Sequence, residues 1–397
     1  MSGEEARLAL DYVSPLPPVR SGIADYSADL LPHLEPLCDL RVIALPGQPI
    51  AREVERRWLP QPSGALGSAG ERVALYHMGN NEHHAAVYRL AMEHPGVVVL
   101  HDVILHHFLL GETLGRGEIE TYRRRLRLEH GALGEAAAGA MRWGAFGDAL
   151  QFGLPANRRL VERQRGVLVH SAWARDVLRE DSPDLAVHAV PMGIPLPQRP
   201  APERGRDFRG RHGIPDDAPL LGSFGFQTPM KRPETAVRAL SAPEMEAVHL
   251  VIAGQLAPTL DLDREIAERG LGSRVHVTGF LDYDEFEAAI VACDLALNLR
   301  YSSAGETSAA LLRVLALGRP TVVSEYAQCA ELPVEAAARV PVGEGEVEAL
   351  VRVAADLLGR PRRLRAMGEA AREYVARHHD PATAARAVVD AATELGR

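Results

Sequence analysis

The chain has 397 residues, 46% hydrophobic and 24% charged, which is an ordinary globular composition with room for two domains. Its formal net charge is -9 and neither half is basic, which argues against a nucleic-acid-binding module. The acidic start, residues 1–5, precedes no apolar leader, and no uncharged run is long enough to cross a bilayer. Cys38, Cys293 and Cys329 are far apart, which predicts reduced, packed thiols. We therefore expect a cytoplasmic protein.

Short apolar runs alternate with helical patterns along the first half of the chain. The predicted strands of this half are residues 8–13, 40–45, 73–76, 97–100, 167–170 and 186–190. Apolar strands separated by helices are typical of a parallel sheet that is covered on both faces.

A proline-rich segment separates the two halves. Five prolines fall close together, which predicts an extended connection: Pro191, Pro195, Pro197, Pro200 and Pro202. After it, strands are predicted at 220–224, 249–253, 274–278, 294–299 and 321–324, and the pattern is helical from 349 onward with a break at 378–381. We predict domains at residues 1–195 and 196–375, and a C-terminal helix at 376–397 that packs back on the first domain.

The predicted fold class is α/β, with two doubly wound Rossmann-like domains facing across a cleft. Ligands of such sheets bind outside the carboxyl ends of the strands, so we expect a site between the domains. This expectation fits binding proteins, epimerases and transferases equally well.

Lys231 is the only lysine of the chain, and it lies in a turn-like segment between a predicted strand and a helix that begins near Pro233. An ammonium is a compact point charge, whereas a guanidinium is a planar fork, so a phosphate site can require the one and not the other. The alternative is an ordinary exposed charge.

Residues 297–324 predict a strand, a loop of small residues, a helix that starts at Thr307 or Ser308, and another strand. Free N–H groups at that start form an anion site, and Glu306 just before it supplies an acceptor for sugar hydroxyls. Phosphate and hydroxyl groups together suggest a sugar nucleotide. The alternative is a capped helix with Glu306 helping to cap it.

Two other features have competing interpretations. Histidines in the first half suggest metal ligands, but their spacing dictates no tetrahedral site, so we predict no metal and favour His101 acting alone at the end of a strand. Arginines near Glu120 suggest a basic helix that contacts an anionic lipid surface, or a solvated face tied by pairs such as Glu120 with Arg124, which we prefer.

The segment Gly305-Glu-Thr-Ser, with the helix that leads to Pro320, resembles the signature of the family-four retaining glycosyltransferases (glycosyl transferases group 1), which have the GT-B fold. Four other segments resemble that family's landmarks in the expected order: residues 14–26, 99–103, 190–195 and 277–280. The resemblance covers nearly the whole chain.

The resemblance implies a role for each matching residue. Lys231 would hold the donor diphosphate, Gly22 would let the opposite loop approach it, and Thr307 and Ser308 would present N–H groups to it. His101 would contact the transferred sugar or the acceptor, and Glu306 would hold sugar hydroxyls. The backbone at Gly279 and Phe280 would meet the base. The other implied donor-binding residues are Gly225, Arg232, Gly254, Arg300 and Gly305.

The chain departs from the family at two positions. The family's two glutamates, seven residues apart, fall on Gly305 and Arg313, with Glu306 one place late. The arginine that precedes the lysine in the family is Phe226 here, and Arg300 or Arg232 is a candidate to replace its charge.

The predicted function is metal-independent transfer of a hexosyl group, with retention, from a nucleoside diphosphate sugar to a hydroxyl of a glycan, lipid-linked or small-molecule acceptor. The nucleotide sugar is a co-substrate, and no cofactor and no nucleic acid partner are expected. Peripheral contact with the inner membrane face through the N-terminal domain is a further expectation. The alternatives are a sugar-nucleotide or glycan-binding protein without turnover and a nucleotide-sugar epimerase.

Overall fold

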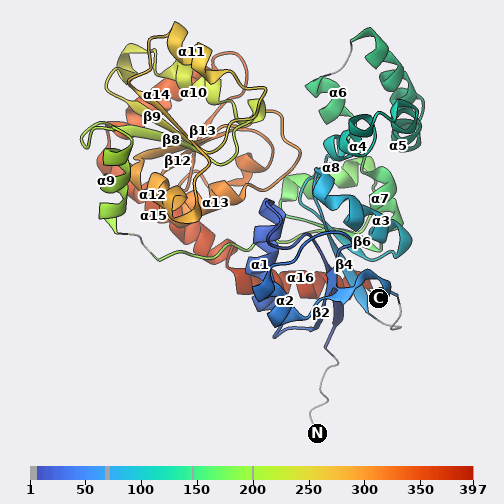
Figure 1. Cartoon of the computed structure of the whole chain (residues 1–397). Coiled ribbons are helices and arrows are strands. Elements are labelled where there is room, and N and C mark those ends of the chain that lie inside the picture. The colour runs from blue at the N-terminus through green and yellow to red at the C-terminus, as the bar shows by residue number, and fades with distance from the viewer. Residues whose placement is uncertain (1–6, 68–71, 145–146, 199–200, 397) are drawn as a thin grey trace. The chain divides into compact units, whose positions relative to one another are not determined.

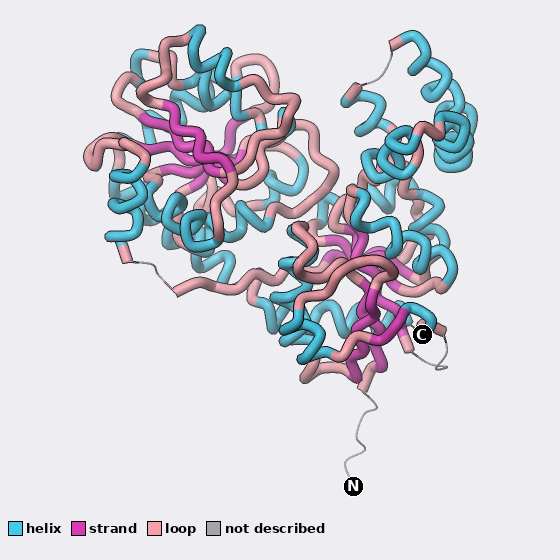
Figure 2. The backbone as a smooth tube through the Cα atoms, in the orientation of Figure 1, coloured by secondary structure: helices cyan, strands magenta, loops and turns pink. Residues whose placement is uncertain are grey.

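The computed structural model describes residues 7–67, 72–144, 147–198 and 201–396, so the acidic start at 1–5 and Pro200 of the linker lie outside the described residues. The chain divides into two compact units. The N-terminal unit comprises Met1–Gly193, Ala304–Thr307 and Pro381–Arg397, and the C-terminal unit comprises Ile194–Ser303 and Ser308–Asp380. Each unit is built on its own sheet (Figure 2).

Within the described residues, the sheet of the N-terminal unit has seven parallel strands in the order β3-β2-β1-β4-β5-β6-β7. The strands are β1 (Ala9–Val13), β2 (Asp39–Ala44), β3 (Gln61–Pro62), β4 (Val73–Met78), β5 (Val97–Leu100), β6 (Gly166–Val169) and β7 (Val187–Ala189). The order reverses direction between β1 and β4, so this sheet is doubly wound.

The helices of the N-terminal unit lie in the crossovers between these strands, except α16, which follows the C-terminal unit in the chain. They are α1 (Gly22–Leu34), α2 (Arg52–Trp58), α3 (Ala85–Glu93), α4 (His106–Glu112), α5 (Ile119–Ala140), α6 (Asp148–Gly153), α7 (Arg158–Arg163), α8 (Ala172–Asp181) and α16 (Pro381–Gly396). Figure 1 shows α4, α5 and α6 grouped beyond the sheet, and α16 against the strands. Helix α16 contacts α1, β4 and β6, and its residues Ala384 and Val388 are fully buried.

The sheet of the C-terminal unit has six parallel strands among the residues described, in the order β10-β9-β8-β11-β12-β13. They are β8 (Leu220–Phe224), β9 (His249–Ala253), β10 (Val275–Gly279), β11 (Leu295–Asn298), β12 (Thr321–Ser324) and β13 (Ala338–Val340). Its helices are α9 (Pro202–Arg211), α10 (Pro233–Ala239), α11 (Leu262–Glu268), α12 (Tyr283–Ala292), α13 (Ala309–Ala316), α14 (Glu346–Leu358) and α15 (Pro361–His378).

Strand β9 shows why apolar runs form covered strands here. Leu250 and Ile252 belong to one buried cluster, whereas Val251 and Ala253 belong to a second one on the other face of the sheet. Because successive side chains of a strand point to opposite faces, an apolar run without polar interruptions buries both faces under helices.

The predicted strands are confirmed within one or two residues at their ends, and the predicted break between the last two helices is confirmed at His379 and Asp380. Two strands were not predicted, β3 and β13, because each has only two or three residues and no apolar run. The three cysteines are free and buried, as predicted. No helix of the described chain has the length and apolarity needed to cross a membrane.

Candidate functional site

The loop that carries Lys231 lies after β8 in the C-terminal unit. Pro229–Lys231 form a short 3-10 turn, Arg232 takes a left-handed conformation with φ 52°, and Pro233 is the first residue of α10, as predicted. The side chain of Lys231 folds back, and its Nζ donates a hydrogen bond to the carbonyl of Phe224 over 2.9 Å. Its ammonium therefore lies at the carboxyl end of β8, which is where ligands bind in such sheets.

Two glycines make room for this arrangement. Gly225 has φ +87°, and a Cβ there would lie 2.9 Å from Lys231 Nζ. Gly254 has φ +147°, and a Cβ there would lie 2.1 Å from the carbonyl oxygen of Gly225. Both positions thus require glycine for conformation and for space, and they bring the ends of β8 and β9 together beside the ammonium.

Lys231 is a partly buried cation beside a second cation. Burial, and then the positive charge of Arg300, lower the pKa of Lys231 to about 7. The segment of Arg300 is fastened to the loop, since Tyr301 N donates to the Met230 carbonyl over 2.9 Å. Among the described residues, no carboxylate forms an ion pair with Lys231. The two neighbouring positive charges of Lys231 and Arg300 favour binding of an anion. A bound anion would raise the pKa of Lys231 and keep its side chain protonated.

Arg232 plays a different part. Its guanidinium forms an ion pair with Glu346, a carboxylate at the start of α14 that is only 2% exposed. Burial raises the pKa of Glu346, while Arg232 opposes that shift. Of the two candidates for the missing cation, Arg300 is thus the one whose charge acts on Lys231, and Arg232 fastens the loop to α14.

Of the two residues predicted to meet the base, Gly279 is half-buried and Phe280 is exposed. Gly279, with φ +70°, ends β10 and forms a bridge with Gly254, and Phe280 after it is 72% exposed. Arg313, which stands in place of the family's second glutamate, lies over the ring of Tyr283 at 5.3 Å from its centroid. This arginine thus has an aromatic partner within its own unit.

The predicted start of α13 is confirmed. Ser308 is the N-cap, and its Oγ accepts a hydrogen bond from Leu311 N over 3.2 Å. Glu306 accepts from Ala304 N over 3.0 Å, a bond within the preceding loop rather than with the helix. The helix is thus capped by the serine, as expected of an oxygen at this position.

The segment Ala304–Thr307 belongs to the N-terminal unit. The Ala304 carbonyl accepts from Val103 N over 2.7 Å and from Ile104 N over 3.2 Å. Thr307 Oγ1 donates to the His170 carbonyl over 3.3 Å. Gly305 has φ +86°, and a Cβ there would lie 2.6 Å from Val103. The segment with three of the predicted residues, Gly305, Glu306 and Thr307, thus lies against the loop that follows β5, on which His101 lies.

His101 is part of a buried cluster of aromatic rings at the ends of adjacent strands. Its ring centroid is 5.3 Å from that of His77 at the end of β4, 4.9 Å from that of His170 after β6, and 5.1 Å from that of Tyr26 on α1. Burial lowers the pKa of His101 and of His77 well below the usual value, with the neighbouring imidazoles adding to the effect. These side chains are therefore neutral at physiological pH.

Sequence reasoning missed this cluster as a unit, since it treated the histidines as separate or as metal ligands. The available signal is that His77, His101 and His170 each stand at the carboxyl end of a predicted strand. Gly22 begins α1 in the same unit, and a Cβ there would meet nothing within 4 Å, so no contact within the described chain explains this glycine.

Two other sequence features are the possible metal ligands and the arginines near Glu120. No three described side chains of His, Cys, Asp or Glu are placed to hold a metal. On α5, Arg123 forms ion pairs with Glu120 at 3.6 Å and with Glu135 at 3.1 Å, which favours the solvated, paired face.

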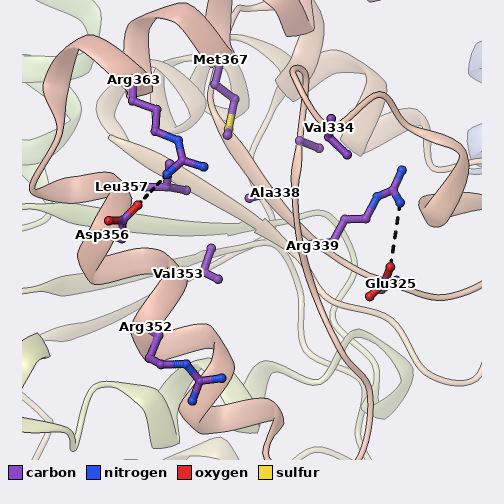
Figure 3. A pocket seen from close by; sticks show the side chains of 11 residues that line it. Glu325, Val334, Ala338, Arg339, Arg352, Val353, Asp356, Leu357, Arg363 and Met367 are labelled. Atoms are coloured by element: carbon purple, nitrogen blue, oxygen red, sulfur yellow. Dashed lines mark hydrogen bonds and ion pairs between the residues drawn. The ribbon is translucent and has the colours of Figure 1, made fainter.

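A cavity of about 480 Å³ lies beside the edge strand β13 in the C-terminal unit (Figure 3). Arg339 faces Glu325 at 3.9 Å and Arg363 pairs with Asp356 at 2.6 Å, so most of its charge is matched by its own lining. None of the predicted site residues lines this cavity.

Comparisons with known proteins agree with these observations. The family described as Glycosyl transferases group 1 matches residues 206–374. The structure of HepE from Anabaena in complex with UDP and glucose is similar, with a TM-score of 0.65 and 15% identity over 98% of this chain and 100% of that one. No curated protein matches the sequence.

Two further structures have the same fold. Sucrose-phosphate synthase from Thermosynechococcus elongatus has a TM-score of 0.64 and 17% identity over 98% of both chains. WaaG, a glycosyltransferase involved in lipopolysaccharide biosynthesis, has a TM-score of 0.60 and 17% identity over 97% of this chain and 99% of that one. The chain thus has the GT-B fold, and its residues 206–374 match the family described as Glycosyl transferases group 1.

Proposed function

We propose that this protein is a glycosyltransferase that moves a hexosyl group, with retained anomeric configuration, from a nucleoside diphosphate sugar to the hydroxyl of a glycan, lipid-linked or small-molecule acceptor. The observation that carries the proposal is Lys231: a partly buried ammonium, with its pKa lowered to about 7, beside Arg300 and two glycines that open the backbone. Two neighbouring positive charges destabilise each other in the empty site, and a bound diphosphate would stabilise both.

Negative charge builds on the diphosphate as the sugar departs. Lys231 and Arg300 would stabilise that charge, and stabilisation by preorganised groups of this kind typically contributes several kcal/mol. Two cations then supply what a metal ion supplies elsewhere, so we propose that transfer is independent of metal.

The residues of the N-terminal unit suit uncharged groups. His101 is neutral and Glu306 supplies carboxylate oxygens, which accept hydrogen bonds from sugar hydroxyls. The family resemblance implies attack from the side of the leaving group, with a diphosphate oxygen taking the proton of the acceptor hydroxyl. In that scheme His101 orients a reactant and takes no proton.

The test is an incubation of the whole chain with uridine and guanosine diphosphate sugars, with and without candidate acceptors. Release of nucleoside diphosphate that depends on acceptor supports transfer. Tight binding without release would show a binding protein instead, and isomerisation of the donor would show an epimerase. Activity that survives chelation of divalent ions supports metal independence, and activity lost with the chelator and restored by the metal contradicts it.

A further inference from the structure

Two buried histidines of the N-terminal unit, His170 of the ring cluster and His84 outside it, have the position of their proton fixed by oxygen acceptors. His170 Nδ1 lies 3.2 Å from the carbonyl oxygen of Val190, and His84 Nδ1 lies 3.0 Å from Asn81 Oδ1. Carbonyl oxygens only accept, and Asn81 Oδ1 also accepts from His83 N. In both rings Nδ1 therefore carries a proton.

The pair of His77 and His101 lacks such an oxygen. His77 Nδ1 lies 3.0 Å from His101 Nε2, so one of these nitrogens donates to the other. His77 Nε2 is sealed from solvent and has no hydrogen-bond partner. If His101 were the donor, the proton of His77 would lie on that sealed atom as an unsatisfied N–H, and such orphan donors are rare in folded proteins. If His77 donates, the sealed atom carries only a lone pair.

We propose that His77 is a positioning residue that donates from Nδ1 to His101 Nε2 and thereby fixes the proton of His101 on Nδ1. The Nδ1 atom of His101 makes no hydrogen bond within the described part of the chain. His101 thus offers a ligand a hydrogen-bond donor and has no free lone pair with which to take a proton.

This inference deepens the proposed function, and the role of the His101 proton in sugar transfer rests on that function. A donor at His101 binds a sugar hydroxyl or phosphate oxygen and cannot serve as the base that deprotonates the acceptor. The acceptor proton must then go to another group, such as the departing diphosphate.

The tautomer is measured by nitrogen NMR of ligand-free protein with ¹⁵N-labelled histidine, in which the His101→Gln variant identifies the signals of His101. We expect the shift of a protonated Nδ1 and a bare Nε2. A protonated Nε2 at His101 overturns the proposal. Because no substrate is present, a protein that transfers no sugar still tests it.

Variants separate positioning from packing. In His77→Asn an amide N–H replaces Nδ1–H, and we expect the tautomer of His101 and kcat to stay near wild type. In His77→Leu the donor is lost, and we expect the Nε2–H form to appear and kcat to fall roughly fivefold to tenfold, the size of one neutral hydrogen bond. Equal behaviour of the two variants contradicts the proposal.

The matched control is His106→Leu. His106 is equally buried in the same unit, but its nitrogens bond the Leu154 carbonyl and the Tyr122 hydroxyl. We expect this variant to lose stability without changing the nitrogen shifts of His101. A change in those shifts as large as that in His77→Leu would show that loss of packing alone moves the proton.

Discussion

The two units share one architecture, but the side chains at their strand ends are charged in one unit and neutral in the other. At the ends of β8 and β11, the C-terminal unit holds Lys231 and Arg300 near one another, a charged arrangement that an anion would relieve. At the ends of β4, β5 and β6, the N-terminal unit holds imidazole and phenol rings that burial keeps neutral. The strand ends of a doubly wound sheet thus define where a site forms, whereas the side chains on the loops define which chemistry it binds.

Removal of the Lys231 ammonium should have the largest effect on activity. In Lys231→Ala, we expect kcat to fall by roughly a hundredfold or more, because the departing diphosphate loses a preorganised cation. Steady-state kinetics with the donor found by the incubation measures the loss. The control is Arg352→Ala, which removes an exposed cation from the rim of the cavity at β13 in the same unit. Equal kinetics of the two variants would remove the basis for the proposed role of Lys231.

Acid should lower the free energy of unfolding through His84, a buried histidine of the N-terminal unit. Burial lowers the pKa of His84 to about 4, below the value of about 6.5 for an unfolded histidine. As pH falls, this histidine therefore takes up a proton in the unfolded state before it does so in the folded state. Its contribution to the stability of the fold is complete above pH 6.5 and is lost between pH 6.5 and 4. His84 alone should cost about 2 kcal/mol by pH 5.

The measurement is denaturant unfolding of the whole chain at pH 7 and at pH 5. We expect His84→Asn to show a smaller loss than wild type. An identical loss in both proteins would mean that His84 does not carry the effect.

The pH dependence of nucleotide binding tests the charged site of the C-terminal unit, because it reports the protonation of Lys231. With the pKa of free Lys231 near 7, the fraction of ammonium falls above that pH, so affinity for nucleoside diphosphate should weaken by about tenfold per pH unit. Binding near pH 7.5 should also take up protons, which calorimetry in buffers of different ionisation enthalpy detects. Affinity that stays flat from pH 7 to 9 would show that this amine does not meet the phosphates.

The smallest expected effect concerns Tyr26. Its hydroxyl is buried without a hydrogen-bond partner, so Tyr26→Phe should leave stability unchanged or raise it by up to about 1 kcal/mol. Thermal unfolding measures this. A loss of more than 1 kcal/mol would show that the hydroxyl makes a hydrogen bond that stabilises the fold.

Much of the fold was predictable because its signals are local. The apolar run 249–253 fills both faces of its sheet, and Pro233 and Ser308 begin their helices through the chemistry of the backbone at helix starts. For Lys231 the sequence left two alternatives open, a phosphate ligand or an ordinary exposed charge, and the side chain is found partly buried with its Nζ donating to Phe224. Whether it binds phosphate stays a prediction.

The rest depends on contacts between distant segments. The attachment of Ala304 to Val103 joins residues about two hundred positions apart through backbone groups, which no side-chain pattern records. The pairing of Arg232 with Glu346 and the approach of His77 to His101 likewise follow from sheet order and packing. Spacing along the sequence cannot distinguish such partners from the many other arginines and histidines.

The position of α16 has a consequence for synthesis of the chain. Leu395 fills the space beside Gly166, and Val73 lies close to Gly396, so α16 completes a core that the strands and helices of the N-terminal unit begin. The ribosome finishes the whole C-terminal unit before that helix emerges. The N-terminal unit must therefore wait, with an apolar surface uncovered, until the C-terminal unit has been made, and a stop codon near Asp380 would leave that surface permanently exposed to chaperones and proteases.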